Sequence, residues 1–342
     1  MVFGILGERA QAAEVSSSAG QTTSMQMMER AEIIVYGEPG RGGLIDRLNT
    51  IERELFGRDL PGSISERHSA ILDFLEVGTP DQPSMLFRLG ILEWLIGEST
   101  QARIGALSRV ERLENDLDGT MQYGRPLAMR IERLLGSLLA DRLTAQEVVL
   151  PAATVLQAQF LDEVRNATAR GGDRVFLALT NDVLVGNVLI APRGSLIDAS
   201  VRSVRRPRMF GGSGRITIDY NALIPLGPQR PFIAEGEASR RTAESMEGVL
   251  GAGGAAIGGA FFLGPLGLGL GALIRGPAAN IYSGDIVFVE TEGDIRVFGY
   301  LVPDNLRIAP NATVRETTVN VLQQPQVGER EIIQLPPEHQ VN

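Results

Sequence analysis

Cysteine and histidine, the side chains most often used as nucleophiles, general bases and transition-metal ligands, are absent or rare in this chain. Among 342 residues there is no cysteine, and the only histidines are His68 and His339. The sequence therefore excludes disulfides, thiolate metal sites and a cysteine nucleophile, and it indicates neither a multi-histidine metal site nor a Ser-His-Asp triad. No P-loop or dinucleotide fingerprint occurs either. We expect no cofactor, no metal and no catalytic residue.

Two pairs of carboxylates are close enough in sequence to act as a general acid and a general base. They are Asp162 with Glu163, and Asp285 with Glu290. With 41 acidic residues such pairs arise readily by chance, and neither lies in a known motif. We therefore predict a non-enzymatic protein. A hydrolase that uses carboxylates alone is the third hypothesis, because it would leave no sequence signature.

Arginines and glutamates recur at a fixed spacing in the first half of the chain. The arginines follow one another after 20 or 21 residues, at Arg47, Arg67, Arg88, Arg109 and Arg130. In three copies a glutamate follows five residues later, at Glu52, Glu93 and Glu114. Such a row could bind a ligand. We favour ion pairs between neighbouring helices, or solvation beside an apolar stripe.

The repeat around these arginines predicts helices. Apolar residues lie three before each arginine and at about one, four and eight after it, which places them on one helical stripe, and a glycine often follows at the helix end. One such helix cannot bury its own stripe, whereas stacked copies can. Residues 31–143 are therefore predicted to form a helical array or bundle with a period of about 21 residues. His68 and Leu72 make the second copy degenerate, and Leu135 replaces the glutamate of the fifth.

The second half of the chain has the pattern of a β domain, predicted over residues 148–310. Short runs rich in Val, Ile, Leu and Phe are separated by Gly, Pro, Asn and Asp, which predicts an antiparallel barrel or sandwich. The predicted strands are 148–150, 154–160, 174–179, 183–190, 196–204, 215–220, 232–236, 286–290 and 295–301. The fold class is thus α+β and multidomain, with a glycine-rich helical insertion in the β domain.

That insertion, residues 248–274, contains no charged residue between Glu247 and Arg275. Its length suffices to cross a bilayer, small residues four apart allow close helix packing, and Pro265 divides it into two arms. We predict a re-entrant hairpin or an oligomeric ring of arms. The alternative is a glycine-rich loop or buried hairpin folded against the β domain. The predicted membrane or oligomer contacts are Gly254, Gly258, Phe261, Phe262, Leu263, Pro265, Gly267 and Gly271.

The basic residues are all arginines, and one group of them is clustered. Arg202, Arg205, Arg206 and Arg208 could contact anionic lipid head groups; a solvated β-turn is the alternative. The net charge of −9 argues against general nucleic-acid binding, because such binding relies on an excess of Lys and Arg.

The two ends of the chain carry signals of their own. An apolar run over residues 1–6 and the small-x-small pattern Ala10-Gln11-Ala12 predict a signal-peptide remnant over 1–13, and an initiation site upstream of Met1 would supply the missing basic region. Residues 14–30 are predicted to be a linker. Residues 311–342, polar and with several prolines, are predicted to be an extension and a flexible tail.

Two resemblances add a location. The helical frame L-x-x-R-L-x-x-I-E-x-x-L-F-G resembles repeats of bacterial envelope proteins of unassigned function. In the β half, three motifs precede the glycine-rich insertion and a final hairpin: Leu150-Pro151-Ala152-Ala153-Thr154, Ile190-Ala191-Pro192-Arg193-Gly194-Ser195 and Gly214-Arg215-Ile216-Thr217-Ile218. Over residues 148–303 this order resembles the TrbI-type scaffold of conjugative type IV secretion channels. The resemblance implies a barrel whose helical insertion reaches the outer membrane and assembles as a ring.

We therefore predict a non-enzymatic cell-envelope scaffold, located in the periplasm or at the outer membrane and membrane-associated through 248–274. Its predicted partners are further copies of itself or an envelope complex. The alternative is a soluble periplasmic binding module for glycan, peptidoglycan or a protein partner.

Overall fold

The computed structural model describes residues 23–97, 99–207, 214–251, 274–276 and 280–306. Residues up to Val302 form one compact unit, and Pro303–Asn342 form a second, which contains the 3-10 helix η2 (Asp304–Leu306). Several predictions fall outside the described residues. They are the signal-peptide remnant, Arg208, the tail from residue 311 onward, and the eight predicted membrane or oligomer contacts between Gly254 and Gly271.

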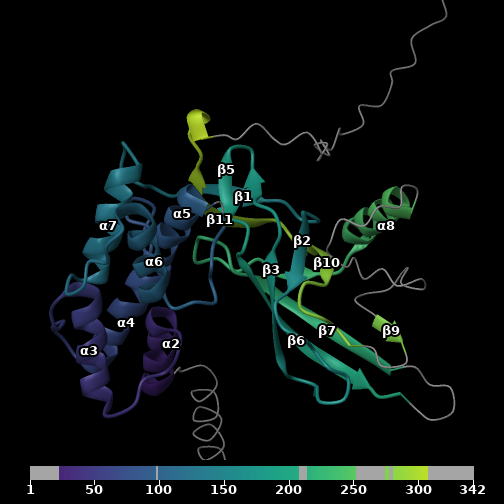
Figure 1. The fold of residues 1–342 in the computed structure, drawn as a ribbon, viewed down its shortest axis with the longest axis horizontal. Coiled ribbons are helices and arrows are strands. Elements are labelled where there is room, and N and C mark those ends of the chain that lie inside the picture. Colours follow the sequence, from purple (N-terminus) through teal and green to yellow (C-terminus); the bar gives the residue numbers. More distant parts are fainter. Residues whose placement is uncertain (1–22, 98, 208–213, 252–273, 277–279, 307–342) are drawn as a thin grey trace, which may run out of the picture. The chain divides into compact units, whose positions relative to one another are not determined.

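The N-terminal half consists of short helices, as the repeat predicts. They are α2 (Ser24–Tyr36), α3 (Leu44–Phe56), α4 (Ile64–Leu72) continued by the π-helix η1 (Asp73–Val77), α5 (Met85–Gly97), α6 (Ala106–Asp118) and α7 (Leu127–Leu138). Figure 1 shows them gathered together in purple to blue. Helices distant in sequence touch, α2 with α6 and α3 with α7. Of the two predicted arrangements, the compact bundle is therefore the one observed.

Local signals fix the ends of these helices. α2 begins at Ser24, inside the predicted linker, because Thr23 and Gln26 form a capping box there. At the other end of α3, Gly57 adopts a left-handed conformation with φ 74°, as a C-cap glycine does. The repeat pattern could not reveal the capping box, because the box lies upstream of the first arginine.

The second copy of the repeat holds one extra residue, and the π-helix absorbs it. The C-cap Gly57 lies ten positions after Arg47, but Gly78 lies eleven positions after Arg67. The N–H of Gly78 donates to the carbonyl of Asp73, five residues earlier, at 2.8 Å. This spacing is that of a π turn, which accommodates one additional residue within a helix.

The C-terminal half is built from antiparallel strands. They are β1 (Gln146–Leu150), β2 (Val155–Phe160), β3 (Arg174–Leu179), β4 (Val183–Val185), β5 (Val188–Ala191), β6 (Leu196–Arg205), β7 (Gly214–Leu223), β8 (Ile233–Ala234), β9 (Ile274–Gly276), β10 (Ile286–Thr291) and β11 (Ile295–Leu301). Most of the predicted strands are present within a few residues of their predicted bounds.

The strands form two sheets around one apolar core. The seven-stranded sheet has the order β8-β10-β2-β3-β6-β7-β9, and the four-stranded sheet has the order β1-β11-β5-β4. An Ala222–Phe232 bridge brings β7 to the chain beside β8, so the larger sheet is a nearly closed barrel. Core residues come from both sheets, for example Leu177 and Val297. The predicted α+β class with an antiparallel barrel is confirmed.

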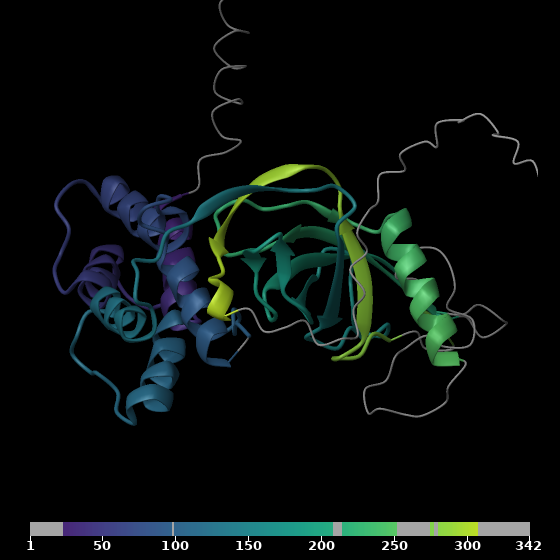
Figure 2. The same ribbon diagram turned by 90° about the horizontal axis from the view of Figure 1, so that it is seen from above.

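Three elements differ from the predicted pattern. The run 183–190, predicted as one strand, is a hairpin in which β4 and β5 flank Gly186, whose φ of 60° favours glycine. Helix α8 (Glu237–Gly251) begins in a polar stretch upstream of the predicted insertion, and β9 begins at the last residue of that insertion. Figure 2 shows α8 in green beside the barrel, where it contacts β10 and β2.

Helix α5 joins the helical bundle to the barrel. Its side chains are apolar on nearly all sides, which is typical of a helix that is covered all round. Its Trp94 donates from Nε1 to Oδ2 of Asp182 at 2.9 Å and packs edge-on against Tyr300. After α5, the N–H of Thr100 donates to the carbonyl of Arg193 in the β5–β6 turn at 2.7 Å. The two halves are thus held together by specific contacts.

Candidate functional site

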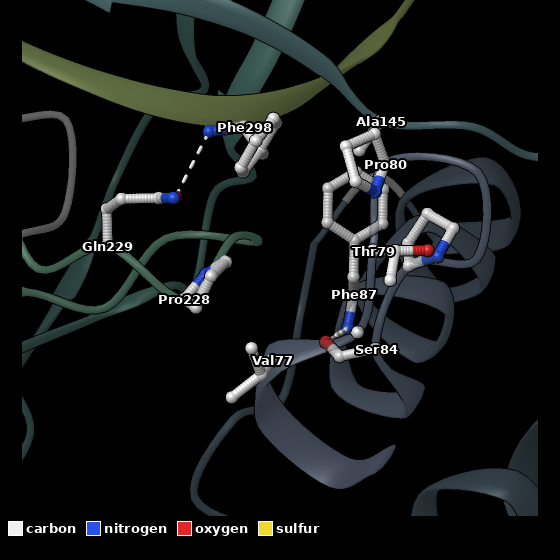
Figure 3. A pocket seen from close by; sticks show the side chains of 11 residues that line it. Val77, Thr79, Pro80, Ser84, Phe87, Ala145, Pro228, Gln229 and Phe298 are labelled. Atoms are coloured by element: carbon white, nitrogen blue, oxygen red, sulfur yellow. Dashed lines mark hydrogen bonds between the residues drawn. The ribbon is translucent and has the colours of Figure 1, made fainter. Parts of the chain in front are cut away.

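A pocket opens where the bundle meets the barrel. It has a volume of about 210 Å³ and is lined by the η1–α5 connection, the start of α5, the loop before β8, and β11. Figure 3 shows Val77 and Phe87 on the helical side, and Pro228 and Phe298 on the barrel side. Every lining residue is uncharged. The pocket can hold an apolar group, but its walls supply no charged acid, base or metal ligand.

The walls of this pocket are fixed by the turn that follows the π-helix. Gly78 has φ 60°, and a Cβ atom there would lie 2.3 Å from the backbone nitrogen of Ser84. The Ser84 hydroxyl accepts a hydrogen bond from the N–H of Phe87, whose side chain is buried. On the barrel side, Oε1 of Gln229 accepts from the N–H of Phe298 at 3.2 Å. No sequence pattern indicated this pocket, because its walls come from segments far apart in the chain.

The recurring arginines and glutamates form buried ion pairs between successive helices. Each glutamate accepts two hydrogen bonds from the arginine of the next copy, at 2.5 to 3.1 Å. The pairs are Glu32–Arg47, Glu52–Arg67, Glu93–Arg109 and Glu114–Arg130. The interpretation as interhelical ion pairs is confirmed, so these side chains already have partners within the bundle.

Each of these glutamates also accepts a third hydrogen bond, from a backbone N–H eight residues further on. The donors belong to Gly40, Leu60, Gln101 and Gln122, at 2.7 to 3.1 Å. A single carboxylate therefore holds the loop that leaves its own helix and the arginine of the helix that follows. We call this three-bond unit the Arg–Glu clamp.

The clamp sets the ionisation of its carboxylates. Burial alone would raise the pKa of Glu32, but hydrogen bonds from Arg47 and the N–H of Gly40, together with the Arg47 charge, lower that pKa below its ordinary value. The pKa of Glu114 is lowered in the same way, against the effect of burial, by Arg130 and the N–H of Gln122. These carboxylates therefore stay ionised although they are buried.

The second copy has no clamp, because Leu72 stands where the glutamate is expected. Arg88, the arginine that would use it, instead donates from Nε to the carbonyl of Pro83 at 2.6 Å and pairs with Glu132 of α7. The gap coincides with the π-helix and with the pocket. The pocket thus lies at the irregular point of the repeat.

His68 lies in the second copy, where other copies have an apolar residue. It is 1% exposed, and neither ring nitrogen has a hydrogen-bond partner among the described residues. Burial, followed by the charge of Arg67, lowers the pKa of His68 below 6.5, while Glu52 opposes this shift. His68 is a neutral core residue.

We expect His68→Leu to raise the free energy of unfolding by about 1 to 3 kcal/mol, because the change removes buried polar atoms without partners. Protons bind first to the unfolded chain, whose histidine titrates near 6.5, so wild-type stability falls as the pH drops below about 6.5. The free energy of unfolding of the leucine variant should fall less over the same pH range. Urea unfolding at about pH 7.5 and about pH 5.5 measures this free energy for both proteins, with His339→Leu as the control. An equal pH dependence in wild type and His68→Leu would contradict the assignment.

The two carboxylate pairs have structural partners. Asp162 accepts two bonds from Arg103, at 2.8 and 3.0 Å, and Glu163 pairs with Arg165. Asp285 accepts from the N–H of Tyr282 at 2.8 Å.

Glu290 has a different role, at the start of α8. Its Oε2 accepts from the N–H of Ser239 at 2.6 Å, so its carboxylate caps the helix. Gly236 leaves the space for it, because a Cβ atom there would overlap the Glu290 carboxylate. The carboxylate that sequence spacing offered as an acid or base instead fixes the helix that leads into the uncharged segment.

Of the predicted head-group arginines that the structure describes, Arg202 and Arg205 lie in the last part of β6 and Arg206 directly follows it. All three are exposed, and Arg202 is bound by Asp219 of β7. Within the described residues, no group of three or more metal-binding side chains occurs. No helix in the described ranges combines the length and the apolar character that a membrane crossing requires.

Comparison with known proteins identifies no family for this chain. No protein-family model matches it, and no curated protein matches it. Among solved structures, it is similar to ComB10 of the Com type IV secretion system of Helicobacter pylori, with 15% identity over 43% of this chain and 90% of that chain. The TM-score is 0.23, which is too low to support an argument about fold or function.

Proposed function

We propose that this protein is a non-enzymatic scaffold of the cell envelope, which associates with a membrane, forms oligomers and takes part in a secretion or envelope-spanning complex. The proposal places it outside the cytoplasm, in the periplasm or at the outer membrane. One observation carries it: the uncharged segment 248–274 leaves the barrel from one fixed element and returns to it at another.

The point of departure is α8. This helix contacts β10 and β2, and the Glu290 carboxylate holds its first turn. The point of return is β9, which pairs with β7 through Gly276 opposite Gly214 and Ile274 opposite Ile216. A segment anchored at both ends can transmit load between the barrel and whatever it contacts, as a scaffold requires.

The rest of the chain is suited to a rigid support. Buried Arg–Glu clamps connect successive helices, and α5 fixes the bundle to the barrel. The clamps are bidentate, which adds geometric specificity to the attraction between the charges. This rigidity supports a structural role.

Deletion of 252–273, with a short Gly-Ser link in its place, tests the proposal. We expect the intact protein to float with lipid vesicles and to elute as an oligomer in light-scattering chromatography, because an uncharged stretch of this length favours lipid or sister subunits over water. The deleted protein should stay in the aqueous fraction as a monomer.

A finer variant replaces Phe261, Phe262 and Leu263 with aspartate, which leaves the length of the segment unchanged. Tyr123→Asp is the matched control, since Tyr123 is an aromatic residue 71% exposed on the α6–α7 loop. If the intact and deleted proteins are equally soluble without detergent and equally monomeric, the membrane-scaffold proposal fails.

The pocket favours a second candidate, a soluble periplasmic binding module. Its uncharged walls, with Phe87 and Phe298, fit an apolar group of a protein partner or a muropeptide better than a charged ligand. A binding screen against glycans, muropeptides and peptides tests this candidate. Flat binding across the panel would count against it.

A further inference from the structure

Arginines occupy directly opposite positions on three adjacent strands of the barrel. Arg205 of β6 pairs in register with Arg215 of β7, and Arg215 pairs with Arg275 of β9. On β7, Gly214 and Ile216 are buried, so Arg215 lies on the outer face, and Arg205 opposite it shares that face. Side chains at such opposite positions lie about 5 Å apart at Cβ.

On β6 and β7 this arrangement places the like charges of Arg205 and Arg215 side by side. Like charges directly opposite each other on neighbouring strands are destabilising, and arginine does not lose its proton. Nearby arginines on the same sheet are neutralised, since Arg202 pairs with Asp219 and Arg174 pairs with Asp198. Within the described part of the chain, no ion pair involves Arg205, Arg206 or Arg215. An external anion would relieve the repulsion.

The position of these arginines indicates what that anion is. Strand β9 directly follows the uncharged segment, and Arg275 is the first charged residue after it. When that segment enters a bilayer, the strand ends beside it lie at the level of the head groups. Guanidinium groups bind phosphate oxygens in a bidentate manner, and basic clusters next to membrane segments bind anionic lipid.

We propose that Arg205 and Arg215, together with the exposed Arg206 that directly follows β6, bind the phosphate groups of anionic phospholipids where the uncharged segment rejoins the barrel; we call these three residues the arginine row. The inference rests on the proposed function. Arg202 does not belong to the row, because its guanidinium group already forms an ion pair with Asp219.

The test compares vesicles of phosphatidylcholine alone with vesicles that also contain phosphatidylglycerol, using the full chain. We expect Arg205→Gln/Arg215→Gln to bind the anionic vesicles roughly thirtyfold more weakly than wild type, and to bind neutral vesicles equally well. Arg202→Gln is the matched control and should bind as wild type does. The difference should shrink at high salt, because salt screens exposed charges.

A second variant separates weaker binding from loss of folding. Arg205→Glu places opposite charges across β6 and β7, so we expect an unchanged or higher melting temperature together with weaker binding to anionic vesicles. A parallel titration with inorganic phosphate and with duplex DNA distinguishes other sources of phosphate.

The outcomes separate the two proposals. If wild type binds neither kind of vesicle, the proposed membrane function fails and the arginine row fails with it. If wild type binds both kinds equally and the double variant behaves identically, the membrane function stands and the arginine row is overturned. Binding of inorganic phosphate or DNA that depends on the row, without preference for anionic vesicles, also overturns it.

Discussion

Replacing Glu114 with alanine is expected to lower the free energy of unfolding by about 3 to 5 kcal/mol, which is typical of breaking a buried ion pair by removing one partner. Arg130, 2% exposed, would lose both bonds to the carboxylate, and the N–H of Gln122 would lose its acceptor. Urea unfolding followed by circular dichroism measures the change.

The matched control is Asp59→Ala. Arg53 also binds Asp59 through two hydrogen bonds, at 2.8 and 2.9 Å, but the two side chains are 64% and 44% exposed. Loss of an exposed pair is expected to cost less than about 1 kcal/mol. Equal losses for the two variants would show that burial does not give the clamp its strength.

Gly194→Ala is expected to lower the free energy of unfolding by about 2 to 5 kcal/mol, from a positive φ and from overpacking. Gly194 has φ 89°, and a Cβ atom there would lie 2.1 Å from the carbonyl oxygen of Thr100. The substitution therefore pushes the α5–α6 connection away from the barrel. Trp94 fluorescence reports this displacement, because its indole is bound to Asp182 of the barrel.

Gly172→Ala is the control for the backbone effect. Gly172 has φ 92°, nearly the same as Gly194, but nothing lies within 4 Å of a Cβ atom added there. Only the cost of the left-handed conformation, about 1 to 2 kcal/mol, is expected. If both variants lose the same stability and leave Trp94 fluorescence unchanged, the Thr100 contact does not hold bundle and barrel together.

The helices could be predicted because their apolar stripe is a local pattern, but their pairing could not. Arg109 and Glu114 lie in the same copy of the repeat, but they do not pair with each other. Arg109 binds the glutamate of the preceding copy, and Glu114 binds the arginine of the following copy. A signal was present, since the paired residues are a nearly constant 15 or 16 positions apart. The third bond of each clamp comes from a backbone N–H, which almost any residue supplies, so no side-chain pattern could show it.

In the β half, prediction succeeded where turns contain several breakers and failed at a two-residue turn, Gly186-Asn187, whose hairpin signal was overlooked. Gly186 lies inside an apolar run and was not recognised as a turn. Helix α8 was missed because its cap, Glu290, comes from a distant strand rather than from a residue just before the helix. The pocket and the arginine row depend on strand register and on the docking of α5, which no local pattern encodes.

The clamps run in one direction along the bundle, and neither terminal helix carries the residue that a further clamp would need. Each link runs from a glutamate to the arginine of the following copy, so head-to-tail growth would need an arginine at the matching position of α2 and a glutamate at that of α7. Those positions hold Met27 and Leu135 instead. Two molecules therefore cannot extend each other into a fibre through this linkage, and any assembly of copies would have to use other surfaces.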